Sequence, residues 1–449
     1  MYVNLLSIIL VFAAVFPAGG SAALIFGQAP IAKPDSAGRY LDLVAGMTAD
    51  EAVALALAAN GEINAFKSEV DASRAMIKQA GLRANPKLSA SGAKQIGGPD
   101  NNQMAEVMLP LELGGRRKAR IAVAQRELEA RELELANQER LLAAEVRLKF
   151  GESLAAIKKL EVTESTLNAA REGYDLVAAR VTEGKTAPLE QNVFLVEVNR
   201  LQSMRETAEG KVEAAMFELR NMIGKKPEEP LRLRGDFHDV IGTLADVTVS
   251  TEQALRQRPD LRGANTIEML AAARIEQAKS EGRLDAGIKA GYQRMDTGFP
   301  VSGFDDHGVL RPVHMRSNVF TFGIEIDLPV LNRNQGAVEA AVFEREAARR
   351  RVEFGELSVR RDVAAAFARY NRAARSLSIF QNGVRDQANA NLQVVWQTYE
   401  LGARSLLDYI AEERRFLDVE NELIDAQLEA YTANIEFLKA TNAPGLTKK

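Results

Sequence analysis

Residues 106–115 read EVMLPLELGG, and residues 324–333 read IEIDLPVLNR. In both stretches, alternating apolar residues reach a Leu-Pro pair and give way to a long charged segment that contains no proline. Alternation with a period of two is typical of a β-strand, whereas the charged segments carry the longer spacing of a helix. Proline suits such a change because it has no N–H with which to continue the pairing of a sheet. We therefore expect Pro110 and Pro329 to mark two equivalent strand-to-helix junctions.

The order of elements around these junctions occurs twice. In the first half, the spacing predicts a helix over 48–84 with a break at Asn60-Gly61, strands over 87–95 and 103–109, and helices over 116–182 and 189–223. The second half predicts a helix over 251–284 with a break at Arg258-Pro259, strands over 285–294 and 317–328, a helix over 333–400 and a last helix to about Asn442. The offset from Pro110 to Pro329 differs by a single position from the offset between Gly184 and Gly402. Because these distant landmarks keep almost the same offset, we infer an internal duplication.

The N-terminal stretch 1–23, MYVNLLSIILVFAAVFPAGGSAA, combines a short apolar core with a small-residue end, which predicts a secretory signal peptide. A membrane anchor is the alternative, although the apolar run is shorter than the ~20 residues that a spanning helix needs. The remaining segments follow from the duplication. We expect an extended leader over 24–47, a first repeat over 48–230, a linker over 231–247, a second repeat over 248–442 and a tail over 443–449.

The composition excludes several classes of protein. The 449 residues contain no cysteine, which excludes disulfides, thiol chemistry and cysteine-ligated metals. The net charge is -4 with 26% charged residues, so no basic excess suggests a nucleic-acid partner. No segment after this N-terminal stretch has the length of a transmembrane helix, so further membrane contact must come from strands or surfaces.

The strand predicted over 317–328 has two contrasting faces. One face carries Phe320, Phe322, Ile324, Ile326 and Leu328, while the other carries Thr321, Gly323, Glu325 and Asp327. A soluble sheet can show the same alternation, but its length and polarity match a barrel wall with lipid outside and water inside. Four strands are too few to close a barrel, and open edges are not tolerated in lipid. We therefore expect several chains to share one barrel, and four strands per chain fit totals of eight, twelve or sixteen.

The segment 116–182 predicts an unusually long helix. Its roughly 67 residues would span on the order of 100 Å. Apolar residues recur in it every seven positions, at Ile121, Leu128, Leu135 and Leu142. This spacing is typical of helices that pack as coiled coils.

Together these features resemble the TolC family of outer-membrane efflux ducts, over nearly all of the chain after the signal peptide. The resemblance rests on the duplicated order and on three passages, LPLELGGRRKAR (109–120), IDLPVLNRNQGAV (326–338) and YELGARSLLDYIAEERRFL (399–417). The first passage, with Gly114 and Gly115 at its junction, is also similar to the CzcC-like branch of heavy-metal resistance. The resemblance implies a mainly α fold with a small β part. It further implies a long α-helical coiled-coil barrel and four transmembrane strands per chain, which close a 12-stranded β-barrel as a trimer.

The resemblance also implies a function. It implies a passive conduit from periplasm to exterior that exports heavy-metal cations or other small toxic solutes, without enzyme activity, cofactor or bound metal. Its partners would be outer-membrane lipid, a periplasmic adaptor and an inner-membrane pump of the resistance-nodulation-division (RND) type. Two alternatives stay open: a duct for type I protein secretion with the same fold, and a soluble periplasmic coiled-coil adaptor. Adaptors usually carry one helical hairpin, whereas the sequence pattern of this chain predicts two.

The resemblance assigns candidate gate residues at the periplasmic end of the tunnel. Tyr399 and Arg404 match residues that tie the inner coiled coil to its neighbours, and Glu190 matches their acidic partner. Asp408 matches one of two inward-facing aspartates, whereas the second position falls on Ala411, which would leave one acid per chain.

Each candidate has a plainer interpretation. Asp408 could be a solvated acid stabilised by the dipole of a helix start. Tyr399 and Arg404 could form ordinary surface pairs worth ~0–1 kcal/mol. Gly184 and Gly402 would form the helix-to-helix turns at the periplasmic tip. His307 and His314 lie near two aspartates, but their spacing fits no standard metal site, so we predict none.

Overall fold

The computed structural model describes residues 37–237 and 246–446. The predicted signal peptide, most of the predicted leader, part of the predicted linker and the last three residues lie outside the described residues. No helix within the two described ranges has both the length and the apolar composition needed to cross a bilayer.

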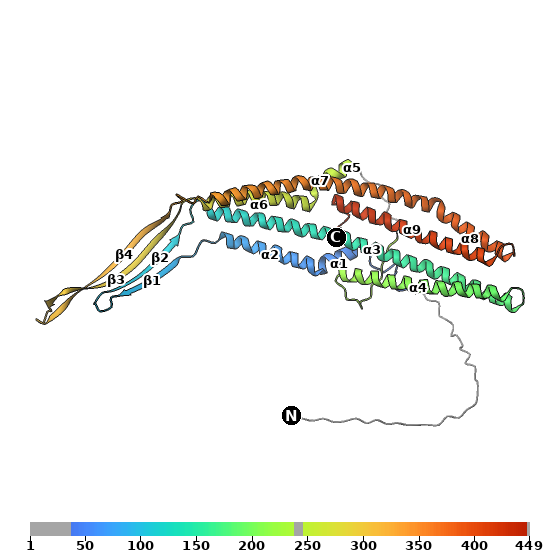
Figure 1. Cartoon of the computed structure of the whole chain (residues 1–449), viewed down its shortest axis with the longest axis horizontal. Coiled ribbons are helices and arrows are strands. Elements are labelled where there is room, and N and C mark those ends of the chain that lie inside the picture. The colour runs from blue at the N-terminus through green and yellow to red at the C-terminus, as the bar shows by residue number, and fades with distance from the viewer. Residues whose placement is uncertain (1–36, 238–245, 447–449) are drawn as a thin grey trace, which may run out of the picture. The chain divides into compact units, whose positions relative to one another are not determined.

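The same order of elements occurs in both halves of the chain (Figure 1). The first half contains η1 (Ala37–Arg39), α1 (Ala49–Ala59), α2 (Gly61–Gly81), β1 (Lys87–Lys94), β2 (Asn101–Pro110), α3 (Arg116–Thr182) and α4 (Pro188–Met222). The second half contains α5 (Val247–Gln257), α6 (Pro259–Glu281), β3 (Asp285–Phe304), β4 (Leu310–Asp327), α7 (Gln335–Ile379), the π-helical segment η3 (Phe380–Val384), α8 (Arg385–Glu400) and α9 (Leu406–Thr441). The predicted duplication is therefore confirmed.

Local sequence signals explain the helix breaks. Asn60 ends α1 and caps α2, because its side-chain oxygen accepts hydrogen bonds from the backbone N–H groups of Glu62 and Ile63. The equivalent break has Arg258 between α5 and α6, with Pro259 at the first position of α6. Proline is well suited to that position because the first N–H of a helix has no partner within it.

Three predicted elements differ most from the structure. The strands β3 and β4 extend well beyond the predicted ranges 285–294 and 317–328, and their pairing shifts register between Gly298 and Ser302. The predicted helix over 333–400 is interrupted by η3, which inserts one wider turn.

The four strands form one antiparallel sheet in the order β1-β2-β3-β4. Within the described part of the chain, β1 and β4 have one neighbour each, so both edges of the sheet are open. Four apolar side chains of β4 are strongly exposed on one face: Phe320 at 71%, Phe322 at 82%, Ile324 at 71% and Ile326 at 51%. On the opposite face, Lys289 pairs with Glu325 of β4 and lies 3.8 Å from Glu106 of β2. The sheet thus has one apolar and one charged face.

Both strand-to-helix junctions are fastened to the end of α6. At the first, Arg116 forms an ion pair of 2.7 Å with Asp285, and its guanidinium also donates to the carbonyl groups of Glu281 and Arg283. At the second, the side chain of Asn334 donates to the carbonyl of Ala278 at 2.9 Å. The carbonyl of Glu281 is one that the helix itself leaves free, whereas that of Ala278 also accepts from the N–H of Gly282 at 3.3 Å.

The backbone turns sharply at the same junctions. Pro110 is the last residue of β2, and Pro329 comes just after the end of β4. Gly114 and Gly115 both have positive φ, and a Cβ on Gly114 would lie 2.9 Å from the Cβ of Arg283. The predicted junction residues therefore lie where each strand gives way to a helix.

The long helix α3 is the centre of the packing, since α2, α4, α6 and α9 all lie against it (Figure 1). Leu160 and Leu167 of α3 are fully buried, whereas Ile121 and Leu128 nearer its start are only partly buried. The apolar core follows the helices in several successive clusters. This arrangement is typical of coiled-coil packing rather than of a single globular core.

Candidate functional site

The two helix-to-helix turns have the same geometry. Gly184 between α3 and α4 has φ +74°, and Gly402 between α8 and α9 has φ +75°. The next residue donates its N–H back over five positions in each turn, from Lys185 to the carbonyl of Arg180 and from Ala403 to that of Thr398, both at 2.9 Å. Glycine suits this left-handed cap because a side chain would strain it. The residues predicted at the tip thus occupy two equivalent caps.

A hydrogen bond joins the two hairpins close to these turns. The hydroxyl of Tyr399, near the end of α8, donates to a carboxylate oxygen of Glu190 in the first turn of α4 at 3.1 Å. Tyr399 is only 7% exposed. Burial, with a further contribution from Glu190, raises the pKa of Tyr399 to about 12. The structure therefore brings together two of the four predicted gate residues, and they come from different repeats.

Aromatic rings surround this bond. The ring centroids of Trp396 and Tyr409 lie 4.8 Å apart, and those of Trp396 and Tyr399 lie 5.8 Å apart. Phe194 of α4 lies 6.2 Å from Tyr409 of α9. These tilted contacts stabilise the packing of α4, α8 and α9 beyond the burial of apolar area.

The other two predicted gate residues point to solvent in the single chain. Asp408 and Ser405 form a capping box at the start of α9, in which the backbone N–H of Ser405 donates to Asp408 at 3.1 Å. Hydrogen bonds from Ser405 hold the pKa of Asp408 below its usual value. Arg404 is exposed, and none of the ion pairs found between described residues involves it. Ala411 is exposed on the same helix.

Sequence reasoning missed a pair of buried carboxyl groups behind the tip. Glu197 of α4 is 1% exposed and accepts hydrogen bonds from Arg200 at 2.9 Å and from Arg414 of α9 at 2.6 Å. Glu413 of α9 is 3% exposed. Its neighbours in the sequence, AEERRF, are those of an exposed charged helix face, so only tertiary packing reveals that it is buried.

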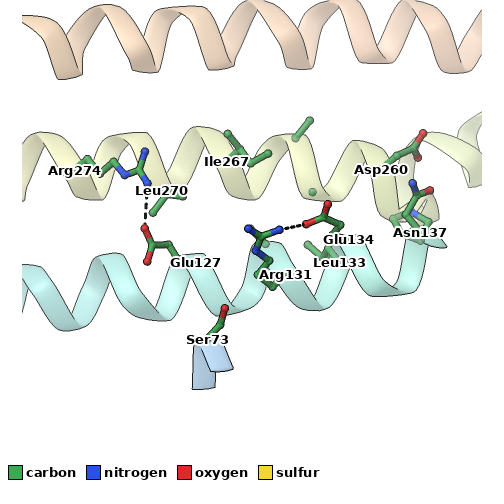
Figure 2. Close-up of a pocket in the computed structure, with 14 residues that line it drawn as sticks. Ser73, Glu127, Arg131, Leu133, Glu134, Asn137, Asp260, Ile267, Leu270 and Arg274 are labelled. Carbon is green, nitrogen blue, oxygen red and sulfur yellow. Dashed lines mark hydrogen bonds and ion pairs between the residues drawn. The ribbon is translucent and has the colours of Figure 1, made fainter. Parts of the chain in front are cut away.

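A groove of about 660 Å³ lies farther from the turns, between α3 and α6 (Figure 2). Its apolar floor includes Leu133, Ile267 and Leu270, and an ion pair of 3.0 Å between Glu127 and Arg274 closes one side. None of the predicted site residues lines it. The groove thus belongs to the packing of the two repeats rather than to the tip.

No metal centre is found among the residues of 37–237 and 246–446. They contain no group of three or more His, Asp or Glu side chains placed to hold an ion. The backbone N–H of His307 donates to Asp305 at 3.0 Å, within the turn between β3 and β4.

Comparison with known proteins connects this geometry to a family. The family model described as "Outer membrane efflux protein" matches residues 52–225 and 251–443, one match in each half of the chain. The cobalt-zinc-cadmium resistance protein CzcC of Cupriavidus metallidurans is 23% identical over 397 residues, which cover 87% of this chain and 86% of CzcC. The nickel-cobalt-cadmium resistance protein NccC of Alcaligenes xylosoxydans xylosoxydans is 25% identical over 64% of this chain and 62% of NccC.

A solved structure shows the same fold. That of CusC, from work on folding and transmembrane channel formation, has a TM-score of 0.72 at 19% identity and covers 88% of this chain and 91% of that chain. The mainly helical architecture with its small sheet and duplicated order is thus a known one. Since the family model matches both repeats and more than half of the sequence, the chain belongs to the outer membrane efflux protein family.

Proposed function

We propose that this chain is the outer-membrane channel of a tripartite system that exports heavy-metal cations. Three copies would pool their sheets into one twelve-stranded barrel and their helices into one periplasmic tunnel. The observation that supports this proposal most directly is the sheet, which has two open edges, a strongly exposed apolar face and a charged opposite face. In lipid, such a sheet is stable only when its edges are paired and its apolar face is turned outward.

The helices suit a conduit rather than a catalyst. Two hairpins, α3–α4 and α8–α9, end in equivalent turns, and buried apolar clusters connect them along their length. We propose that the tunnel is passive and takes its energy from an RND pump of the inner membrane, through a periplasmic adaptor. Family membership favours this role over that of a soluble adaptor.

The cargo is proposed from the relatives. CzcC and NccC are resistance proteins for cobalt, zinc, cadmium and nickel. The charged face of the sheet, with Glu106 and Glu325 beside Lys289, would line the water-filled barrel. Carboxylates along a narrow path attract cations and repel anions, which suits this cargo.

We further propose that Tyr399, Glu190, Arg404 and Asp408 form the gate at the periplasmic end. The hydrogen bond of Tyr399 to Glu190 supports a tie between the hairpins. Arg404 and Asp408 are exposed in one chain, so they would act between neighbouring subunits or on the axis of the trimer.

The experiment is to delete the gene for this protein in its own host and to complement the deletion from a plasmid. We expect resistance to cobalt, zinc, cadmium or nickel to fall several-fold without the chain, and the protein to be recovered from the detergent-extracted outer membrane. Recovery from the soluble periplasm would contradict the channel proposal. Unchanged metal resistance together with loss of a secreted protein would instead indicate type I secretion.

A further inference from the structure

The inner side of α9 carries one carboxyl group in an otherwise apolar seam. We define the seam as Tyr409, Ile410, Glu413 and Leu417, which lie on one face of the helix at spacings of three and four residues. Tyr409 and Ile410 belong to the cluster with Val177 and Phe194, and Leu417 belongs to the next cluster with Leu167, Ala170, Val198 and Leu201. Glu413 therefore lies between two apolar clusters that join α9 of the second repeat to the α3–α4 hairpin of the first.

This carboxyl group has no cation of its own. One oxygen of Glu413 accepts a weak hydrogen bond of 3.4 Å from the hydroxyl of Tyr409, and the other is buried without a partner among the described residues. The two nearby cations, Arg200 and Arg414, are both hydrogen-bonded to Glu197. A buried acceptor without a partner costs free energy, and a buried negative charge without one costs more.

The other helices around α9 supply no compensating charge. On α3, the charged residues of the adjoining stretch are Arg171, Glu172 and Asp175, whereas the charges that act on the pKa of Glu413 are those of Glu197, Arg200 and Arg414. On α8, Tyr399 is bound to Glu190, and Arg385 is bound to Glu420. The helix α7 contacts α9 farther along, where Tyr370 and Leu377 meet Leu423 and Ala430.

We propose that Glu413 is a proton-binding site that controls how tightly α9 holds the α3–α4 hairpin. With a proton, the carboxyl group is neutral and places no charge in the apolar seam. When it gives that proton to water, the interior holds two carboxylates, Glu413 and Glu197, of which only Glu197 is hydrogen-bonded to Arg200 and Arg414. The seam is then weakened between the two hairpins that the proposed gate holds together.

The electrostatics agree with this geometry. Burial first, and then the charge of Glu197, raise the pKa of Glu413 to about 7. A carboxyl group whose pKa is higher in the folded state than in the unfolded state is destabilising when ionised. The penalty is absent below the ordinary pKa of about 4.3, grows as pH rises, and reaches its full size above about pH 7.

The consequence for transport rests on the proposed channel function. If opening requires α8 and α9 to move away from α3 and α4, a neutral Glu413 favours the closed arrangement and an ionised one favours opening. Acidification of the periplasm would then close the channel, and alkaline conditions would ease its opening.

The test compares E413Q with E420Q in the full-length protein, purified in detergent. Glutamine is neutral at every pH and has nearly the shape of the protonated acid. Glu420 is the matched control because it is also buried on α9, one heptad away, but accepts a hydrogen bond of 2.7 Å from Arg385. Thermal unfolding is measured between pH 5 and pH 8.5.

We expect the Tm of E413Q to exceed that of the wild type least near pH 5, where most of the penalty is absent, and by about 3 to 6 °C near pH 8.5. E420Q should melt below the wild type throughout, because it leaves Arg385 without its carboxylate. Parallel Tm curves for E413Q and the wild type would overturn the proton site. If E413Q does not assemble, E413L fits the apolar seam and makes the same comparison.

Single-channel conductance in planar bilayers tests the second half of the proposal. Wild-type conductance should rise severalfold from pH 5 to pH 8.5. The conductance of E413Q should stay, at every pH, at the value that the wild type shows at pH 5. A pH response of E413Q equal to that of the wild type would overturn the link to opening. If neither protein conducts, the proposed channel function fails, while the melting curves still decide whether Glu413 binds the proton.

Discussion

At the scale of single residues, the hydroxyl of Tyr399 is a direct polar link between the two hairpin tips. Tyr399→Phe removes one hydrogen bond to a carboxylate and should weaken the contact by about 1.5–3 kcal/mol. In the proposed gate this raises single-channel conductance, and Arg404→Ala should raise it further. Tyr174→Phe is the control, because Tyr174 bonds to Gln191 within a single hairpin at 3.2 Å. Unchanged conductance in Y399F/R404A would contradict the tie.

Asp408 has a local role in the capping box and a proposed role on the axis of the trimer. Asp408→Asn separates the two, since the amide oxygen of asparagine can still accept the hydrogen bond from the backbone N–H of Ser405 but carries no charge. We expect its reversal potential in a salt gradient to move toward zero, while the exposed acid change Asp418→Asn leaves it unaltered. Because the pKa of Asp408 is lowered, wild-type cation preference should persist at about pH 5. Equal reversal potentials in the wild type and D408N would place Asp408 away from the constriction.

The sequence revealed some of these residues and not others, for a physical reason. Tyr399, Arg404 and Asp408 lie within one motif, so they could be recognised together. Glu413 lies in the same motif, but its charged neighbours in the sequence predict a solvent-exposed helix face. Arg116 likewise reads as one of several basic residues, although it binds the end of α6. Their roles depend on partners in the other half of the chain, which no local pattern reports.

At the scale of elements, α3 accommodates an aromatic ring at a glycine. A Cβ on Gly151 would lie 2.6 Å from the ring of Tyr431 on α9, whereas Gly210 in α4 has nothing within 4 Å. We expect Gly151→Ala to destabilise the protein by about 1–3 kcal/mol through overpacking. Gly210→Ala should instead stabilise it by roughly 0.5–1 kcal/mol through helix propensity. Chemical denaturation measures both, and a G151A variant as stable as G210A would show that the ring moves aside without cost.

The strand β4 offers a matched test of orientation. Phe322→Lys places a charge on the apolar face and should cost about 2–4 kcal/mol if that side chain meets lipid near the middle of the bilayer. Thr321→Lys places the same charge on the opposite face, toward water. We expect F322K to be depleted from the outer membrane and T321K to be retained. Similar recovery of both variants would contradict the proposed orientation of the sheet.

Prediction succeeded best for the elements with a strong period. The helix predicted over 116–182 has those bounds in the structure, because its pattern is long and uninterrupted. The ends of β3 and β4 were missed because Gly298 and Pro300 break the alternation, although the backbone continues to pair across a register shift. The π-helical segment η3 was missed because no proline marks it and a widened turn changes the period by only one residue.

At the scale of the whole molecule, duplication explains why one chain has two hairpins with equivalent tips. Each repeat contributes one hairpin and two strands, and the polar bond between Tyr399 and Glu190 crosses between the repeats. The sequence could predict the repeats because each depends on local periodicity. It could not predict which face of one repeat meets the other, because that choice depends on side chains far apart in the chain.

The two open edges of the sheet have a genetic consequence. In a barrel closed by three subunits, each β1 edge must pair with the β4 edge of a neighbour. One subunit with a mutated edge therefore prevents the whole barrel from closing. If a cell makes wild-type and edge-mutant subunits in equal amounts, random mixing leaves only about one trimer in eight with three wild-type subunits. Mutations at β1 or β4 should therefore be dominant over the normal allele, whereas a simple loss of the protein would be recessive.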